Sequence, residues 1–337
     1  MDHPFFSVVI PVYNTVHELE RCVGSITEQT FRDFEIVLVD DGSRDGSGEL
    51  CDALSLKDNR IKVIHKENGG AAAARNTGIY AATGEYLMFV DSDDMWDDPH
   101  AMEKLVRILE ERPVSDIVCF GVKIYKEDGS LVKIRKTELP ESCGSGKYEI
   151  LKELVYRNYF FSACYNRVYS RKFMLDNELL FIPGMLCEDI EWVARVMVHC
   201  AHPQVYSGQF YKRIQRSEGS QTSSIGEKNV RAILLSIEKG VQYAREHCEN
   251  EELLALYLEY WAYQYAMLMG FVPKMKDASD YKDVIERLQA LKYLLQYDHV
   301  KKIKMVRRVV SLLGVQGACT VLAAYYRFGR KLRSRNA

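Results

Sequence analysis

The chain has 337 residues and a mass of 38.8 kDa, which is enough for about two domains of ordinary size. Apolar residues make up 47% and charged residues 27%, so the composition is globular and excludes a disordered protein. The 45 basic and 47 acidic side chains nearly cancel, which argues against nucleic-acid binding as the main function. Residues 300–337 hold ten Lys and Arg but no Asp or Glu, so an acidic body precedes a basic tail.

The cysteine pattern indicates a reducing compartment. The nine cysteines are an odd number, and no two are spaced as a C-x-x-C pair. This is typical of free thiols in a cytosolic protein rather than of a disulfide framework or a zinc site. The N-terminus has an acid and no Lys or Arg ahead of its apolar run, so no secretory signal is expected.

In chain order, the first 95 residues alternate apolar strands with helices. Phe6 to Val12 is a continuous apolar run rich in β-branched residues, which is typical of a buried parallel strand. Three more strands are predicted at 34–39, 61–64 and 86–90, with helices after Thr15, from Asp45 and over 71–82. The alternation predicts an α/β fold, with a parallel sheet covered by helices on both faces.

Beyond residue 100 the pattern is less regular. Two strands are predicted at 116–120 and 122–125, then a turn at Asp128-Gly129, a loop over 138–147, and helices at 147–157 and 188–198. After residue 226 the pattern is helical almost throughout. We therefore expect a first domain over 1–225, with halves 1–99 and 100–225, and a helical region over 226–337.

Polar loops follow three of the predicted strands. They read Pro11-Val12-Tyr13-Asn14, Asp40-Asp41-Gly42-Ser43 and Asp91-Ser92-Asp93-Asp94. In parallel sheets, ligands bind where the carboxyl ends of the strands meet the loops. The three loops are therefore expected to line one ligand crevice.

Paired carboxylates in these loops suggest metal and nucleotide binding. Asp91 and Asp93 are alternate residues of an extended segment and share a face. Their oxygens suit Mn²⁺ or Mg²⁺, which in turn binds a diphosphate, although a solvated helix-capping turn is the alternative. Asp40 and Asp41 can accept hydrogen bonds from a nucleobase or ribose, or can simply form a turn.

Three later segments carry further candidates, each with a plainer alternative. Arg75 follows a glycine turn on a small-residue helix and can pair with a phosphate, or can be an ordinary surface arginine. Glu188 and Asp189 open a helix, where one can act as a general base or both can only interact with the helix dipole. Arg213 and Ser220 supply donors that can close over a diphosphate, or they belong to a plain basic loop.

With these segments assembled, the chain resembles the family 2 glycosyltransferases of the GT-A fold. The resemblance covers about residues 5–99 and extends to about 215 through Glu188-Asp189. It implies a nucleotide-sugar-binding GT-A domain with a mostly parallel sheet, followed by a helical C-terminal region. The segments that carry it are Ser7–Asn14, Gln29–Phe31, Glu35–Ser43, Asn68–Gly70, Ala74–Asn76, Gly84–Tyr86 and Asp91–Asp94.

The resemblance implies an inverting, metal-dependent transfer of a sugar from a nucleotide diphosphate donor, with UDP-sugars favoured. The acceptor would be a hydroxyl of a glycan or lipid-linked glycan in bacterial cell-surface polysaccharide synthesis. Asp189 would be the base with Glu188 beside it, Asp93 would bind Mn²⁺ or Mg²⁺, and Asp91 would face the metal or the ribose. The residues implied for nucleotide binding are Pro11, Val12, Tyr13, Asp40, Asp41, Arg75, Asp91 and Ser92.

The basic tail is predicted to meet a membrane. Residues 309–326 carry no charge and are flanked by Arg307-Arg308 and Arg327. The favoured interpretation is a cationic amphipathic helix over 300–335. It would attach a cytoplasmic protein to the anionic inner face of the plasma membrane. A helix docked on the protein itself and a membrane span are the alternatives. The sequence does not indicate the oligomeric state.

Rival functions lack their signatures. The first loop has no G-x-G-x-x-G for a nicotinamide cofactor, and Gly144-Ser-Gly-Lys147 lacks the first glycine and the final Ser or Thr of a P-loop. A sugar nucleotidyltransferase should open with a glycine-rich basic loop, which is absent. A non-catalytic, nucleotide-binding scaffold at the membrane is the remaining alternative.

Overall fold

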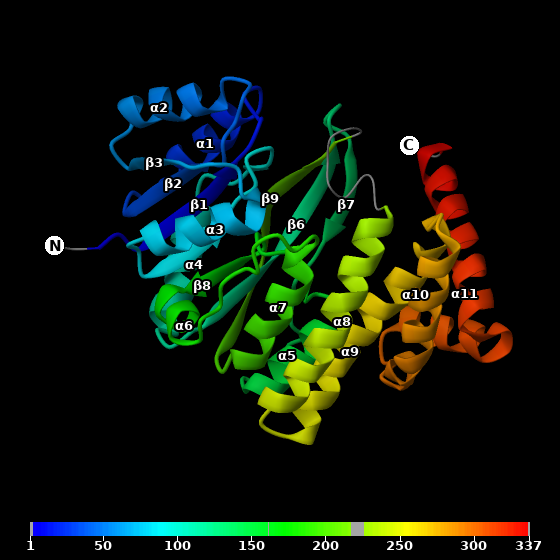
Figure 1. The fold of residues 1–337 in the computed structure, drawn as a ribbon. Coiled ribbons are helices and arrows are strands. Elements are labelled where there is room, and N and C mark those ends of the chain that lie inside the picture. Colours follow the sequence, from blue (N-terminus) through cyan, green and yellow to red (C-terminus); the bar gives the residue numbers. More distant parts are fainter. Residues whose placement is uncertain (1–2, 161, 217–225, 336–337) are drawn as a thin grey trace. The chain divides into compact units, whose positions relative to one another are not determined.

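The computed structural model describes residues 3–160, 162–216 and 226–335 of the chain (Figure 1). The chain divides into two compact units. Unit 1 comprises Met1–Ile150 and Phe161–Glu218, and unit 2 comprises Leu151–Phe160 and Gly219–Ala337. The predicted domain boundary near residue 225 lies outside the described residues and stays a prediction.

Unit 1 is built on one mixed sheet. The described strands follow the order β3-β2-β1-β4-β8-β6-β9-β5, and β7 pairs with β6. The strands are β1 (Phe6–Val12), β2 (Phe34–Asp40), β3 (Ile61–His65), β4 (Tyr86–Phe89), β5 (Met95–Trp96), β6 (Ile117–Lys126), β7 (Leu131–Arg135), β8 (Arg167–Ser170) and β9 (Pro203–Gln215). The helices are α1 (Leu19–Thr27), α2 (Ser47–Lys57), α3 (Gly70–Ala81), α4 (Ala101–Glu111), α6 (Arg171–Asp176) and α7 (Glu188–His199), and α5 (Lys147–Tyr156) divides between the units.

The predicted alternation of strands and helices in the first 95 residues is confirmed. Strand β1 pairs in parallel with β2 and β4, and β2 pairs in parallel with β3. The carboxyl ends of these strands therefore lie at one edge of the sheet. Strand β8 pairs antiparallel with β4 and β6, so the sheet is mixed beyond that point.

Helices cover both faces because β1 is apolar on both faces. Val8 and Ile10 belong to a buried cluster with Leu19 and Cys22 of α1 on one face. Val9 points to the opposite face, where α3 lies so close that a Cβ on Gly78 would be 2.2 Å from Val9 Cγ1. The sheet is thus the middle layer of three. The loops that follow β1, β2 and β4 lie at the edge formed by the carboxyl ends of these strands.

The later strands differ from the prediction. The two strands expected at 116–120 and 122–125 are one strand, β6, whose register with β9 shifts at Gly121. A Cβ on Gly121 would lie 2.5 Å from Gln209 Cγ, so a glycine permits the close approach of the two strands. The residues at this shift do not alternate simply between the two faces, which is the pattern on which the strand prediction relied.

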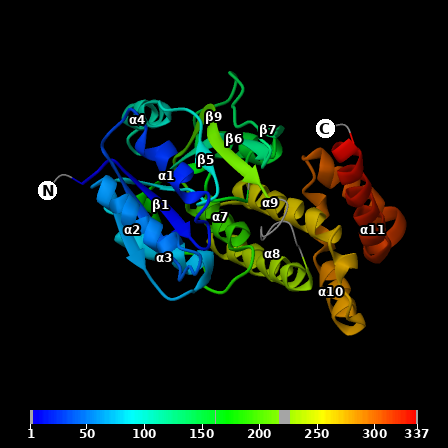
Figure 2. The ribbon, with the colours of Figure 1, turned by 90° about the horizontal axis from the view of Figure 1, so that it is seen from above.

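Unit 2 is helical, as the sequence predicts. Its described elements are α8 (Glu227–His247), α9 (Glu251–Met269), η1 (Val272–Lys274), α10 (Ala278–Ala290), η2 (Lys292–Gln296) and α11 (Lys301–Arg335), seen from a second side in Figure 2. Helices α8 and α9 touch where Gly240 faces Trp261. Gly314 has φ 67° and ψ 176°, so it breaks α11 into two helical segments.

Two helical glycines provide a matched test of the packing in unit 1. We expect Gly78→Ala to destabilise the fold by about 1–3 kcal/mol, because its methyl group would overlap Val9. We expect Gly24→Ala in α1 to stabilise by about 0.5–1 kcal/mol, because its Cβ meets nothing within 4 Å. Urea unfolding followed by circular dichroism measures both. Equal destabilisation by the two changes would contradict the packing of α3 on β1.

Candidate active site

The three polar loops predicted to converge are joined by hydrogen bonds at one edge of the sheet. The Asp41 amide donates to the Val12 carbonyl at 2.9 Å, which ties the second loop to the first. The Thr15 hydroxyl donates to the Ser92 hydroxyl at 3.0 Å, which ties the first loop to the third. The structure therefore brings together the segments that begin at Pro11, Asp40 and Asp91.

Arg75 of α3 is the centre of a cluster of carboxylates. One guanidinium nitrogen lies 2.7 Å from Glu188 Oε1 and 3.5 Å from Asp189 Oδ1. The other lies 2.9 Å from Asp91 Oδ1. Arg75 is almost fully buried, and its guanidinium lies over the ring of Phe181 at 5.4 Å. One arginine therefore joins the end of β4 to the start of α7.

Asp189 lies in this cluster and is partly open to solvent. Its Oδ1 is buried beside Arg75 without a hydrogen bond among the described residues, while 22% of the side chain is exposed. Burial raises the pKa of Asp189 to about 6; Arg75 opposes the shift, and the charges of Glu188 and Asp91 add to it. A carboxylate with this pKa is ionised at neutral pH and is basic enough to accept a proton.

The start of α7 is held in place from both sides. Cys187, the residue before Glu188, adopts a left-handed conformation with φ 57°, which turns the chain sharply into the helix. Asn76 of α3 exchanges two hydrogen bonds of 2.8 Å with the backbone of Phe181. The ring of Phe181 stacks on the buried Trp192 of α7 at 4.3 Å. These contacts fix the position from which Glu188 and Asp189 face Arg75.

The four residues after β4 have different environments. Asp91 and Asp93 keep 30% and 28% of their side chains exposed. Burial and the nearby Asp91 raise the pKa of Asp93, and Arg216, whose Nε lies 3.3 Å from Asp93 Oδ2, opposes the shift. Asp94 is buried and accepts hydrogen bonds of 2.7 Å from the Tyr211 hydroxyl and the Ile214 amide. Asp91 and Asp93 are thus open to a ligand, and Asp94 anchors β9.

On the β2 side, the two acids are occupied by protein donors. Asp41 accepts from the Gly69 and Gly70 amides at 2.9 and 2.7 Å and from Lys66 at 2.6 Å. Asp40 lies 3.0 Å from the His65 imidazole, and hydrogen bonds to Asp40 and to Asp52 raise the pKa of His65. Both aspartates are buried. They hold the loops that shape this end of the crevice.

The remaining predicted residues differ in exposure, and one lies outside the described residues. Pro11 is partly buried and Tyr13 is exposed, while Val12 and Ser92 are buried. Arg213 of β9 is near Tyr165, and its pKa is raised by the charges of that residue, Asp94 and Asp91, against the effect of burial. Ser220 lies outside the described residues.

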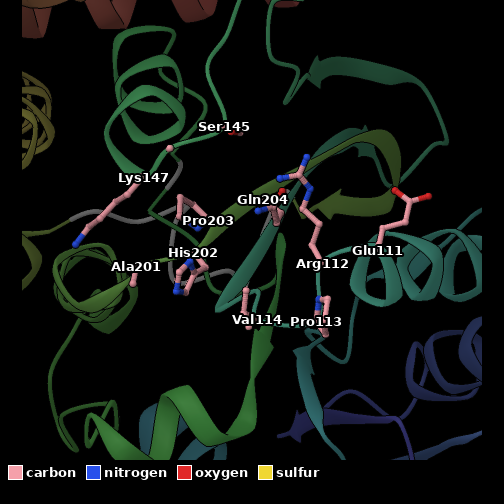
Figure 3. A pocket seen from close by; sticks show the side chains of 11 residues that line it. Glu111, Arg112, Pro113, Val114, Ser145, Lys147, Ala201, His202, Pro203 and Gln204 are labelled. Carbon is pink, nitrogen blue, oxygen red and sulfur yellow. The ribbon is translucent and has the colours of Figure 1, made fainter.

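Two cavities of unit 1 lie away from the Arg75 cluster. A cavity of about 650 Å³ at the starts of β6 and β9 is lined by residues that include Arg112, Lys147 and His202 (Figure 3). A second hollow, of about 960 Å³, runs along α1 past Arg21 and Trp96. Neither of these two cavities is lined by a predicted site residue.

The metal prediction rests on two carboxylates, those of Asp91 and Asp93. Across 3–160, 162–216 and 226–335, no group of three or more His, Cys, Asp or Glu side chains is arranged to hold a metal ion. Asp91 and Asp93 together offer two carboxylates, which leaves the other positions of an octahedral ion to a ligand's phosphate oxygens and water. This donor set fits a metal that arrives with a diphosphate.

Several positioning residues escaped the sequence analysis. Asn76, Tyr211 and His65 each fix a predicted site residue or the segment that carries it. The sequence could have indicated Asn76, because it belongs to the Ala74–Asn76 segment of the family resemblance. For Tyr211 and His65 the sequence offers no indication, because their partners Asp94, Asp40 and Asp52 are distant along the chain.

Comparison with known proteins identifies the family. Residues 7–176 match the model for "Glycosyl transferase family 2", which is half of the chain, so the chain belongs to this family. It is 48% identical over 126 residues to the glycosyltransferase GlyG of Streptococcus pneumoniae, covering 37% of this chain and 41% of that one. The chain thus spans about two fifths of the length of that relative.

Solved structures show the fold. The chain matches S. aureus TarS 1–349, crystallised in complex with UDP-GlcNAc, with a TM-score of 0.68 and 21% identity over 96% of this chain and 92% of that one. It also matches the mannosyltransferase PcManGT from Pyrobaculum calidifontis, in complex with GDP-Man and Mn²⁺, with a TM-score of 0.58 and 14% identity over 96% and 87% of the chains. The predicted GT-A-like α/β fold with a helical C-terminal region is therefore confirmed.

The anchoring of β9 by Asp94 gives a test of the site's framework. We expect Tyr211→Phe to destabilise the fold by about 1–3 kcal/mol, because Asp94 Oδ2 loses its hydroxyl donor in a buried place. Tyr165→Phe is the matched control, since the Tyr165 ring stacks on Tyr211 and its hydroxyl has no hydrogen bond within the described part of the chain. Thermal unfolding compares the two variants. Equal losses would show that the hydroxyl of Tyr211 is not what anchors β9.

Proposed function

We propose that the protein is an inverting glycosyltransferase that moves a sugar from a nucleotide diphosphate sugar to an acceptor hydroxyl. The observation that carries this proposal is the Arg75 cluster, which puts the ligand-facing Asp91 and the proton-accepting Asp189 on one guanidinium. Inversion requires attack from the side of the anomeric carbon opposite to the leaving diphosphate. A base and a diphosphate site held at a fixed separation suit that geometry.

A UDP-sugar is the proposed donor. The loops after β1 and β2 would receive the base and ribose, with Pro11 and Tyr13 at the rim and the buried Asp40 and Asp41 shaping the floor. Arg75 would support the nucleotide through Asp91 and Glu188 rather than by reaching into solvent. TarS, which shares the fold, was crystallised with UDP-GlcNAc, and this agrees with the proposal.

A divalent cation is the proposed cofactor, held by Asp93 and Asp91. When bound with the diphosphate, Mn²⁺ or Mg²⁺ would offset the negative charge that develops on the leaving group. Two carboxylates with exposed oxygens meet that need. Arg213 and Arg216, on and beside β9, would supply further positive charge toward the diphosphate.

Asp189 is the proposed base. It would take the proton of the acceptor hydroxyl as the hydroxyl oxygen bonds to the anomeric carbon and the bond to the diphosphate breaks. Its carboxylate lies beside Arg75, and the 22% of the side chain that stays exposed is where the acceptor hydroxyl would donate its hydrogen bond. Glu188 points to Arg75 at 2.7 Å and would orient the guanidinium.

The proposed acceptor is a glycan or lipid-linked glycan used in building a bacterial cell-surface polysaccharide, with the protein at the cytoplasmic face of the plasma membrane. GlyG, a bacterial glycosyltransferase, is similar to 126 residues of this chain and supports the general class.

Replacement of the base tests the proposed function. We expect Asp189→Asn to lower the transfer rate by about 10²–10⁴-fold and to leave donor binding nearly unchanged, because only proton transfer is lost. Asp176→Asn, at the exposed end of α6, is the matched control and should retain full activity. Transfer is measured as nucleoside diphosphate release and donor binding by calorimetry. An Asp189→Asn enzyme with near-normal transfer would rule out this assignment.

The raised pKa of Asp189 predicts an acid limit of activity. A base with a pKa of about 6 is protonated below that pH, so transfer should fall about tenfold per unit below pH 6. Arg75 is the positive group that opposes the shift, and Glu188, Asp91 and Cys164 also face the carboxyl. Arg75→Gln should therefore move the limit to higher pH. A rate that is flat from pH 5 to 8 would contradict the role of Asp189.

The metal assignment is tested by binding alone. We expect Asp93→Ala to abolish the effect of Mn²⁺ on UDP affinity, because one of the two ligand carboxylates is lost. Asp97→Ala is the control, since Asp97 is similarly exposed but pairs with Lys123 at 2.8 Å. Calorimetric titration of UDP with and without Mn²⁺ measures both. An unchanged Mn²⁺ effect in Asp93→Ala would exclude Asp93 as a ligand.

A further inference from the structure

Helix α11 has one face buried in unit 2 and one face without a partner. Ile303, Val306 and Val310 are buried on the inner face, and the Lys302 ammonium lies 4.7 Å from the ring of Tyr326 farther along the helix. Gly270 at the end of α9 leaves room for Tyr326, since a Cβ there would lie 2.1 Å from that ring. The helix is therefore docked along α9, and it forms the outer edge of unit 2 in both views (Figures 1 and 2).

The outward face combines positive charge with exposed leucines. Lys301, Lys304, Arg308 and Leu312 recur at helical spacing, opposite to the buried face. Leu312 is 83% exposed and Leu313 is 52% exposed, next to the break at Gly314. Val321 and Tyr325 are also exposed, beyond that break.

The charges on this face are not neutralised by the protein. Lys301, Lys304 and Arg308 have no acidic partner in the described part of the chain, whereas Arg307 pairs with Asp298 at 3.0 Å. No Asp or Glu occurs from residue 300 to the end of the sequence. A surface that is positive and apolar at once is complementary to an anionic lipid leaflet.

A membrane span suits the same helix less well. Lys301–Arg327 is long and apolar enough to cross a bilayer, and 28% of its most apolar window is buried within the protein. Crossing would remove Ile303, Val306 and Val310 from the core of unit 2. The break at Gly314 would also leave unsatisfied backbone groups in the lipid.

We propose that α11 lies on an anionic membrane surface through the basic face of Lys301, Lys304 and Arg308, with Leu312 and Leu313 inserted among the lipids. The proposal goes beyond sugar transfer and holds whatever the acceptor is. It assigns membrane attachment to unit 2, whereas the candidate site for sugar transfer lies in unit 1. Attachment of this kind is reversible and weakens with salt.

The test is sedimentation of the full chain with vesicles. We expect binding to vesicles of 70% phosphatidylcholine and 30% phosphatidylglycerol at low salt, and release at 1 M NaCl. The triple variant Lys301→Glu, Lys304→Glu, Arg308→Glu should weaken binding at least about a hundredfold, because three cationic contacts are lost. The double variant Leu312→Asp, Leu313→Asp should weaken it at least about tenfold.

Controls separate this proposal from its alternatives and from the proposed function. Leu56→Asp in α2 is matched in chemistry, since Leu56 is 90% exposed, and should bind vesicles normally. All variants should retain UDP affinity, so a loss of vesicle binding does not reflect a damaged candidate site. Absence of binding to anionic vesicles would overturn the proposal. So would retention of the protein in membranes at 1 M NaCl and alkaline pH, which indicates a span, or a dimer that Leu312→Asp, Leu313→Asp dissociates.

Discussion

The buried guanidinium of Arg75 is the interaction on which the site depends. A buried charge is costly unless it is paired, and Arg75 is paired with carboxylates from two directions, Asp91 after β4 and Glu188 at the start of α7. These partners are 16 and 113 residues away along the chain. The pairing therefore fixes the separation between the predicted diphosphate end and the predicted base. Removing any one partner would leave an uncompensated charge among the others.

Other residues of unit 1 fix the segments that carry the Arg75 cluster. Asn76, next to Arg75 in the sequence, holds the backbone of Phe181, and Phe181 stacks on Trp192 within α7. Asp94 fixes β9 through Tyr211, so the segment that bears Arg213 approaches the same edge. Acidic residues in the family segments thus divide into two groups. Asp40, Asp41 and Asp94 hold loops and strands, whereas Asp91 and Asp189 remain partly open to a ligand.

The sequence predicted the parts of the fold that depend on local pattern. Strands β1, β2 and β4 are buried on both faces and read as continuous apolar runs, so they could be placed together with the loops after them. The polar, half-buried strand β9 and the short β8 carry no such run and were missed. The continuity of β6 across Gly121 was also missed, because it depends on pairing with β9 rather than on local alternation.

In the candidate site, too, some features could be predicted from local sequence and others depend on contacts between distant segments. Convergence of the loops follows from parallel pairing, but the partners of Arg75 follow from the tertiary fold. Arg75 was expected to face a phosphate directly, and nothing in the spacing indicates that Glu188 would occupy one of its nitrogens. In the same way, Asp41 offers no local sign that its oxygens would be taken by the Gly69 and Gly70 amides.

The most direct test of this account is the release of nucleoside diphosphate from a panel of nucleotide sugars, with Mn²⁺, with Mg²⁺ and with EDTA. Without an acceptor, water would take the place of the acceptor hydroxyl, so slow hydrolysis of the donor is the expected reaction. We predict metal-dependent release from one UDP-sugar, and a slower release in the Arg75→Gln variant. Failure of every nucleotide sugar both to bind and to react, in a folded protein, would contradict the account and favour a non-catalytic scaffold.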